Sequence, residues 1–439
     1  MLGTLSAKDG VNVVRTLSAR DDRDRPGALR WLARLGPGLI TGAADDDPSG
    51  IATYSQAGAA YGFGLLWTAL FSLPLMIAVQ LMCARIGLVA RRGLGSVLRE
   101  FYPPWVLWLA CGLVVVANTV NLGADLAGMG AAAALLTGAP ASLFVPLFAV
   151  LVLALLVLAS YARLIRIFKW MTLTLLAYVV TAFVVHPDWG RLLRETFLPH
   201  VALDRDAMLT IVAILGTTIS PYLFFWQAAQ EAEEGSHHAG RSLGRMLGLA
   251  ATDTRAGMLV SNFIMYFVIL TTGATLHASG HSQIETAAQA AAALQPLAGG
   301  AAGLLFALGV IGTGLIGVPV LAGSAAYAVA EASRWRRGMD EKPRTAPRFY
   351  AVIAVATILG AAFDIAHMNA IRMLIWAAVI NGVLAPPLIV VIVVIGNDRR
   401  VMGSYTNGWA LNVGGVVAAL VMTTAAVALV WFSISAIHI

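Results

Sequence analysis

Three consecutive carboxylates inside an apolar segment are the feature of this sequence best suited to chemistry. Residues 45–50 read Asp-Asp-Asp-Pro-Ser-Gly, within a run, 35–61, that otherwise consists of apolar and small residues. A charged side chain at the bilayer centre costs about 2.5–3.5 kcal/mol on insertion scales, so such residues are rare and usually functional. Proline and glycine interrupt a helix and free backbone carbonyls beside the carboxylates. The segment therefore predicts a cation-binding transport site at a break in a membrane helix.

A second interrupted segment lies in the other half of the chain. Residues 216–221 read Gly-Thr-Thr-Ile-Ser-Pro, again small and polar with a proline at the end. Counted along the predicted helices, the two breaks fall in the first and the sixth. Five helices per half is an odd number, so the second half is inverted relative to the first. Paired broken helices of this kind point to a substrate site at the interface between repeats.

The two breaks supply the candidate metal ligands. Asp47 is the first candidate, because its carboxylate stands at the break; its alternative role is to cap the half-helix that starts at Pro48, and both roles can coexist. Gly50 offers a carbonyl or simply leaves space. Thr217 and Ser220 offer hydroxyl or carbonyl oxygens from the second break, and ordinary small-residue helix packing is the alternative for both.

Other polar residues are candidates for the ion path or gate. Asp45 and Asp46 either face an aqueous vestibule, where they would concentrate cations, or form a solvated face of the half-helix. Asp125, with Asn121 nearby, is a carboxylate in the middle of the third helix, where it would relay ions or protons or else bond to a neighbouring helix. Tyr222 follows the second break and either lines the inner path or packs in the core.

One further cluster resembles a metal site by composition. It consists of three glutamates and two histidines at the predicted cytoplasmic end of the sixth helix: Glu231, Glu233, Glu234, His237 and His238. We interpret it as a solvated helix end. No His-Glu-x-x-His, Gly-x-Ser-x-Gly or phosphate-binding lysine loop occurs, so we expect neither an enzyme nor a bound cofactor.

The composition indicates an all-α polytopic membrane protein. Of 439 residues, 59% are hydrophobic and 12% charged, against about 25% charged in soluble domains. About 20 apolar residues span a bilayer, and such runs predict eleven helices. They lie near 33–60, 63–90, 103–136, 141–160, 164–186, 207–233, 251–278, 297–333, 349–365, 369–396 and 408–436. The net charge of +6 is no sign of nucleic acid, and we expect no such partner.

The basic residues test this topology. With the N-terminus in the cytoplasm, all 29 lysines and arginines fall on the cytoplasmic side except Arg191, Arg194, Arg205 and Arg372. Such a bias follows the positive-inside rule, and a wrong helix count would scramble it. The C-terminus then lies outside. We predict a cytoplasmic tail at 1–30, a first inverted repeat at 31–200, a second at 201–397, and the eleventh helix within 398–439.

With these residues laid out, the chain resembles the NRAMP family of divalent metal transporters over most of its length. The matching motifs include Gly-Pro-Gly-Leu at 36–39, Asp-Pro at 47–48, Gln-Ala-Gly-Ala at 56–59, Leu-Leu-Trp at 65–67, Arg-Ile-Gly at 85–87, Asp-Leu-Ala at 125–127 and Val-Met-Gly at 401–403. The resemblance implies the LeuT-like fold, with two inverted five-helix repeats. This agrees with the symmetry inferred from the two breaks.

The sequence departs from the family pattern at the site itself. The family's first-helix asparagine ligand is Gly50 here, and its sixth-helix Met-Pro-His motif becomes Ser220, Pro221 and Tyr222. The glutamate three residues after the third-helix aspartate falls at Gly128, and the tenth-helix glutamine falls at Ala378. The thioether ligand and the histidine implicated in proton handling are therefore both missing.

These departures favour an oxygen-only site. Thioether ligands favour later transition metals, whereas oxygen and water suit magnesium and manganese. Mg²⁺ usually keeps several waters and binds one or two carboxylates, so a wider site at Asp47 would suit it. The pattern resembles the NRAMP-related magnesium transporter branch, which lacks the methionine and is not evidently proton-driven.

The function predicted is Mg²⁺ import, with Mn²⁺ tolerated, by alternating access without proton coupling. The protein would be a monomer in a prokaryotic inner membrane, in contact with lipid, and the metal ion would be its substrate. Two alternatives remain: a proton-coupled Mn²⁺ or Fe²⁺ symporter and a sodium-coupled organic-solute symporter.

Overall fold

The first predicted helix is broken where the sequence indicates. In the computed structural model, α3 (Pro37–Asp45) and α4 (Pro48–Tyr61) are separate half-helices. Asp47 between them has an extended backbone, with φ of −68° and ψ of 170°, and its side chain accepts a hydrogen bond from the Gly50 N–H. Proline is favoured at the first position of a helix because its missing N–H has no partner there anyway. Pro48 and Asp47 together therefore start α4.

The second break has the same design with different residues. α12 (Arg205–Thr218) ends before Ile219, whose φ of −121° and ψ of 62° are not helical, and α13 (Pro221–His237) begins at the proline. The Leu223 N–H donates to the Ser220 carbonyl at 3.2 Å, which closes the first turn of α13. The sixth predicted helix is thus broken as well.

The structure describes residues 36–158, 170–171, 173–199, 204–237, 242–339, 341–363 and 368–435. Contacts group Pro37–Ile439 into one unit, separate from Met1–Gly36. The predicted cytoplasmic tail at 1–30, His238 and the first part of the predicted fifth helix lie outside the described residues.

Long apolar helices make up most of the remaining described chain. They are α5 (Trp67–Ala90), α7 (Pro104–Thr137), α8 (Ala141–Leu158), α14 (Leu243–Thr272, continued by η2, Gly273–His277), α17 (Ala302–Ala332), α19 (Ala370–Asn397) and α21 (Trp409–Ser435). Within the described ranges, eight helices are long and apolar enough to cross a membrane, when α12 and α13 count as one. Two apolar helices, α10 (Leu176–Val185) and α18 (Pro347–Ala362), are shorter. The count of eleven spans stays a prediction.

Several short helices were not predicted. They are α6 (Leu94–Phe101), α11 (Trp189–Phe197), α15 (Ala287–Ala292), α16 (Gln295–Ala298) and α20 (Arg399–Met402). They are too short for a count of apolar runs to detect. In addition, α14 begins at Leu243 rather than near 251, two turns earlier than predicted.

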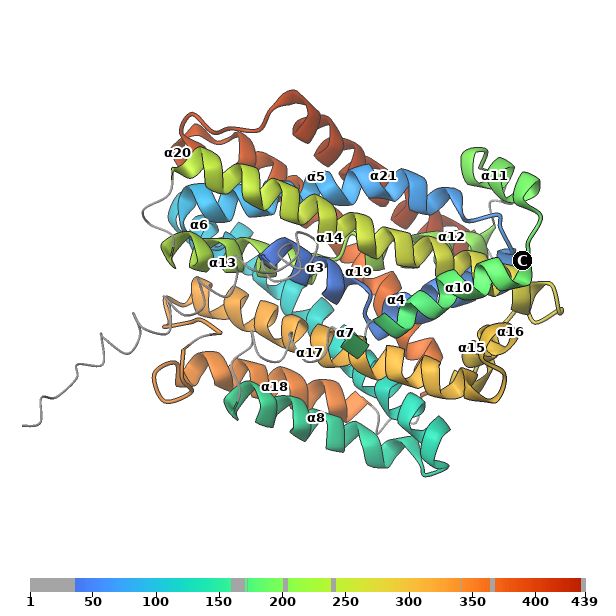
Figure 1. The fold of residues 1–439 in the computed structure, drawn as a ribbon. Helices are drawn as coiled ribbons and strands as arrows, with labels where there is room; N and C mark the ends of the chain where they lie inside the picture. Colours follow the sequence, from blue (N-terminus) through green and yellow to red (C-terminus); the bar gives the residue numbers. More distant parts are fainter. Residues whose placement is uncertain are drawn as a thin grey trace, which may run out of the picture. The chain divides into compact units, whose positions relative to one another are not determined.

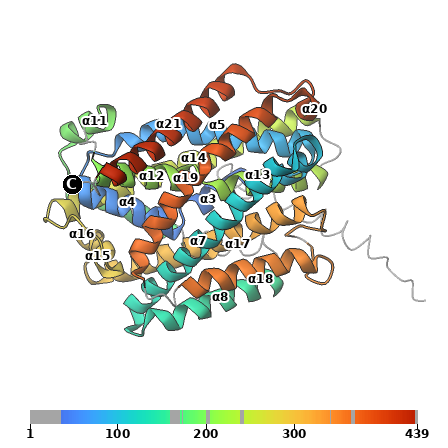
Figure 2. The same cartoon turned by 180° about the vertical axis from the view of Figure 1, so that it is seen from behind.

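The helix packing follows the expected repeat symmetry. α4 packs on α14, and its counterpart α13 packs on α5, the helix that corresponds to α14 in the first half. Likewise α7 packs on α8 and α17 packs on α18. Figures 1 and 2 show α8 beside α18, and α21 beside α19 and α5 on the other side. α7 and α17 lie against each other between these groups.

Glycines allow two half-helices to approach their neighbours at backbone distance. A Cβ placed on Gly42 of α3 would lie 2.4 Å from the Gly257 carbonyl of α14. A Cβ placed on Gly216 of α12 would lie 2.0 Å from the Ala378 carbonyl oxygen of α19. Both distances are far below van der Waals contact, so only glycine fits at either position. Small residues serve this purpose widely in membrane helices.

Candidate metal site

The Asp47 carboxylate accepts hydrogen bonds from three helices. Its Oδ1 accepts from the Ser49 hydroxyl at 2.6 Å and from the Gly50 N–H at 2.8 Å, both in the first turn of α4. Its Oδ2 accepts from the Asn121 amide at 2.9 Å and from the Tyr222 hydroxyl at 3.3 Å. Asp47 is 2% exposed. A buried carboxylate needs such donors, so Asp47 is both a helix cap and the centre of a polar site.

Tyr222 joins the two breaks. Its hydroxyl also donates to the Ala44 carbonyl at 2.8 Å, one of the carbonyls freed at the end of α3. The Ser324 hydroxyl of α17 donates to the Tyr222 carbonyl at 2.7 Å. From the sequence, Tyr222 either lines the inner path or packs in the core; in the structure it is buried and its hydroxyl contacts Asp47, and its role in the path stays a prediction.

Asp125 lies on the opposite wall of the same site. It is fully buried, and neither carboxylate oxygen has a hydrogen-bond partner of good geometry among the described residues. A Cβ placed on Gly317 of α17 would lie 3.2 Å from the Asp47 Cβ and 3.8 Å from Asp125 Oδ2. Gly317 therefore keeps a space between two carboxylates open. Nothing in the sequence distinguishes it from the rest of the 43 glycines.

Asp45 and Asp46 face a different helix. Ser261 of α14 donates through its hydroxyl to Asp45 Oδ2 at 2.6 Å and to Asp46 Oδ1 at 3.1 Å. Asp45 is 0% and Asp46 6% exposed. Neither side chain forms the solvated helix face considered as an alternative from the sequence. The prediction that Asp46 takes part in the ion path is untested by this geometry.

The predicted ligands from the second break are close to the site but turned toward their own helix. The Thr217 hydroxyl donates to the Ile214 carbonyl at 2.9 Å, and the Ser220 hydroxyl donates to the Gly216 and Thr217 carbonyls at 2.8 and 2.6 Å. In the described structure, neither hydroxyl is hydrogen-bonded to Asp47. A Cβ placed on Gly50 would lie 3.3 Å from the Asp45 carbonyl oxygen, so Gly50 leaves space there. Their roles as metal ligands stay predictions.

The glutamate cluster at the end of α13 is not simply a solvated helix end. Glu231 is 2% exposed and accepts from the Gln227 amide at 2.9 Å, while Gln227 itself accepts from the Thr41 hydroxyl of α3. The interpretation was therefore wrong for Glu231, because helix α3 covers that face of α13. Glu234 is exposed, as expected. The residues that the structure describes hold no group of three or more acidic, histidine or cysteine side chains arranged for a metal ion.

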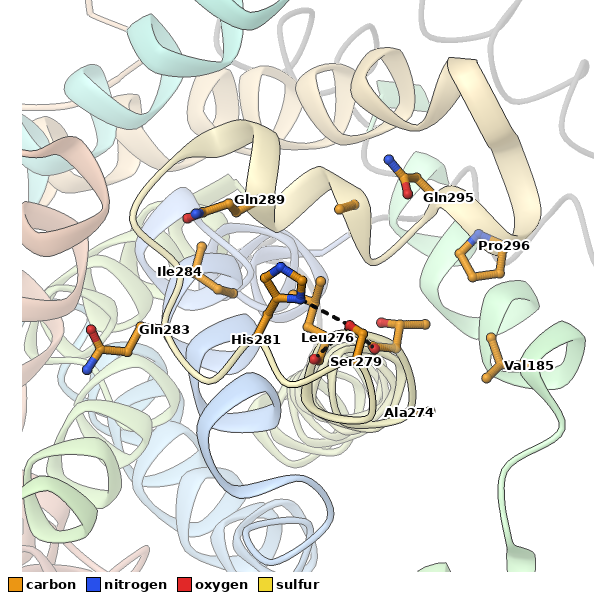
Figure 3. A pocket seen from close by; sticks show the side chains of 12 residues that line it. Val185, Ala274, Leu276, Ser279, His281, Gln283, Ile284, Gln289, Gln295 and Pro296 are labelled. Carbon is orange, nitrogen blue, oxygen red and sulfur yellow. Dashed lines mark hydrogen bonds between the residues drawn. The ribbon is translucent and has the colours of Figure 1, made fainter.

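A separate cavity of about 630 Å³ lies where η2, α15 and α16 meet (Figure 3). His281 points into it, and the Ser279 hydroxyl lies 3.2 Å from the His281 Nδ1. Its remaining lining includes amide and apolar side chains such as Gln289, Gln295 and Val185, but no carboxylate. A site for a divalent ion needs anionic oxygens, so this cavity is no candidate for one.

Two broken helices that enclose buried carboxylates, within a bundle of apolar helices, define a membrane transporter of the inverted-repeat class. The chain belongs to the natural resistance-associated macrophage protein-like (Nramp) family, whose model matches residues 38–432. The resemblance to a family of divalent metal transporters is thereby confirmed.

Similar proteins agree with this assignment. The divalent metal cation transporter MntH of Pectobacterium carotovorum is 25% identical over 406 residues, which cover 89% of this chain and 92% of that protein. MntH of Bradyrhizobium diazoefficiens is 28% identical over 392 residues, which cover 86% and 84%. With such relatives, the expectation that the protein is not an enzyme is confirmed.

Solved structures confirm the fold. The manganese transporter of Eremococcus coleocola superposes with a TM-score of 0.73 at 16% identity, covering 92% of this chain and 87% of that one. MhsT in complex with L-phenylalanine gives a TM-score of 0.56 at 13% identity, covering 90% and 98%. The LeuT-like fold predicted from the paired breaks and the motifs is therefore present.

Proposed function

We propose that this Nramp protein carries divalent metal ions across the membrane by alternating access, with Mg²⁺ preferred and Mn²⁺ accepted. The names of its relatives, divalent metal cation transporter and manganese transporter, support the divalent substrate. The preference for Mg²⁺ rests on the atoms around Asp47. Its location would be a prokaryotic inner membrane, with the N-terminus in the cytoplasm.

The observation that carries the proposal is the hard, oxygen-rich surrounding of Asp47. The carboxylate meets two hydroxyls, one amide and one backbone N–H. Asp125 adds a second buried carboxylate, and Gly317 keeps the space between the two carboxylates open. Ser220 stands where the family's methionine is expected from the motif. Carboxylates with room for water suit Mg²⁺, which gives up its hydration shell reluctantly.

The ion needs no coupled proton on energetic grounds. A single charge gains about 2.3 kcal/mol per 100 mV, so a divalent ion moving into the cytoplasm at −100 mV gains about 4.6 kcal/mol, twice that value. The membrane potential alone would then drive import.

Alternating access requires the half-helices to separate. The Tyr222 hydroxyl bonds to Ala44 of α3 and to Asp47 at the break. Movement of α3 away from α13 would break the first contact and release the second. Asp47 would then exchange a protein donor for water on the side where the ion leaves.

The test is Mg²⁺ influx into proteoliposomes that contain a magnesium-sensitive dye and a pH dye. We expect influx without internal acidification, loss of influx in Asp47→Ala, and full influx in Asp398→Ala, a carboxylate outside the membrane spans. Influx of Mn²⁺ but not Mg²⁺, together with acidification, would instead establish a proton-coupled manganese symporter.

A further inference from the structure

We infer that Asp45, Asp46 and Ser261 form a second site for a divalent cation, beside the Asp47 site. The inference rests on the proposed function, the transport of divalent metal ions. It adds that the protein binds two substrate ions rather than one. Because the two sites share one helix break, both ions would be carried by the same moving elements.

The two carboxylates converge on one atom. Asp45 Oδ2 and Asp46 Oδ1 both accept from the same Ser261 hydroxyl, at 2.6 and 3.1 Å. A hydroxyl has one proton, so it can satisfy only one of them at a time. A cation beside the hydroxyl oxygen would meet both carboxylates, and that oxygen keeps a lone pair for the same ion.

One further polar atom of this cluster lies here without a partner of good geometry. Asp45 Oδ1 is buried and has no such hydrogen-bond partner among the described residues, while the buried Tyr54 hydroxyl lies beside the Thr217 side chain of α12. Tyr54 is 1% exposed. A Cβ placed on Gly50 would lie 3.3 Å from both the Tyr54 ring and the Asp45 carbonyl oxygen, so the two residues are neighbours at the break. An unpaired buried polar atom is costly, and a bound ion removes that cost.

The side chains of the second site contact a different helix from those of the first site. Asp47 reaches Asn121 of α7 and Tyr222 of α13, whereas Asp45 and Asp46 reach Ser261 of α14. The donors around Asp47 occupy both of its oxygens, while Asp45 keeps one oxygen free. The three carboxylates therefore divide between two groups of hydrogen-bond donors.

Charge balance supports two divalent ions. Four buried aspartates, Asp45, Asp46, Asp47 and Asp125, surround the break, and no described lysine or arginine forms an ion pair with any of them. A buried carboxyl without a countercharge is stable only when it takes up a proton or a cation. Two divalent cations would balance the four carboxylates once these are ionised, and carboxylate pairs with hydroxyl and water are the ligands that Mg²⁺ and Mn²⁺ prefer.

A second ion has a consequence for release. Two divalent ions at neighbouring sites repel each other, and ions in multi-site pathways leave faster for that reason. Loading of the Asp45–Asp46 site would thus promote departure of the ion from Asp47.

Mn²⁺ is the probe that tests the inference, since it reports both how many ions are bound and whether they lie close to each other. Equilibrium dialysis of the purified full-length protein with Mn²⁺ should give two ions per chain. The electron paramagnetic resonance spectrum should be broadened by coupling between them. The double variant Asp45→Asn, Asp46→Asn should bind one ion and show the resolved hyperfine lines of an isolated Mn²⁺. Glu231→Gln, a matched change of a buried carboxylate outside both sites, should still bind two.

One Mn²⁺ per wild-type chain would overturn the second site, and so would unchanged binding in the double variant. If that variant does not fold, Ser261→Ala removes only the shared hydroxyl and should weaken the second binding step roughly tenfold, since the ion loses one of its proposed oxygen ligands. An unchanged second step in Ser261→Ala refutes the site equally. A wild type that transports but binds one ion keeps the proposed function, whereas one that binds two and transports neither Mg²⁺ nor Mn²⁺ refutes the function alone.

Discussion

The two helix breaks look alike in sequence and differ in what they contact. At the first, Asp45, Asp46 and Asp47 form hydrogen bonds with α7, α13 and α14. At the second, the hydroxyls of Thr217 and Ser220 donate to carbonyls of their own helix. The first break is therefore a site of carboxylates bonded to neighbouring helices, whereas the Thr217 and Ser220 hydroxyls of the second break donate within their own helix. Symmetry of the fold does not imply symmetry of chemistry.

Substitution at the two breaks should separate them most strongly. Asp47→Asn should lower Mn²⁺ uptake at least 100-fold, because it removes the charge that binds the ion and places an amide among donors. Ser220→Ala should stay within about threefold of wild type, since its hydroxyl serves only its own helix. Initial uptake rates in proteoliposomes measure both. Equal losses would show that the second break binds the ion as directly as the first.

The close helix contacts at the two breaks should be equally sensitive to replacement of their glycines by a larger residue. Gly42→Val and Gly216→Val should each destabilise the protein by more than the roughly 1–3 kcal/mol typical of overpacking, because backbone atoms oppose the new side chain. Thermal unfolding in detergent measures this. Gly112→Ala on α7, where a Cβ meets nothing within 4 Å, is the control and should unfold no earlier than wild type. Tolerance at Gly216 alone would mean that only the first break is tightly packed.

Tyr222 links the breaks and should have an intermediate effect. Tyr222→Phe removes a donor that competes with the ion for Asp47 Oδ2, and a hydrogen bond of this kind contributes about 1 kcal/mol net. The KM for Mn²⁺ should fall about fivefold, with kcat lowered because release is slower. A raised KM would show that the hydroxyl is itself an ion ligand.

A carboxylate outside the membrane spans gives the smallest effect. Asp398 accepts from the Arg400 guanidinium and backbone N–H and from the Tyr102 hydroxyl, and these contacts lower its pKa to about 2. A carboxyl whose pKa is lower in the folded state stabilises that state above about pH 4, and this contribution is lost as the pH falls toward 2. Asp398→Asn should therefore cost less than about 1 kcal/mol at pH 7, because the pair is solvated, and still less at pH 3. Unfolding midpoints at both pH values test it, and a cost that grows toward pH 3 would contradict the ion-pair explanation.

The sequence predicted the breaks and the fold because those signals are local. Pro48 and Pro221 lack an N–H, and aspartates are conspicuous in an apolar run, so both breaks could be placed within a residue or two. Ser261 and Gly317 could not be found in this way, since their roles come from helices hundreds of residues away. Glu231 was misjudged for the same reason, because nothing local shows that α3 covers it. Which carboxylate contacts which neighbouring helix depends on how the half-helix is rotated about its axis. That rotation is known only from the packed structure.

The glycine contact between α3 and α14 has a consequence for the rate of the transport cycle. Gly42 and Gly257 meet backbone to backbone, with no side chains interlocked at that point. Separating interdigitated helices requires many rotamers to change together, whereas two smooth surfaces can slide or part without such rearrangement. We therefore expect this contact to hold α3 against α14 while adding little to the activation barrier for their separation. At this point the two helices fit closely and can still move past each other, because no side chains are interlocked between them.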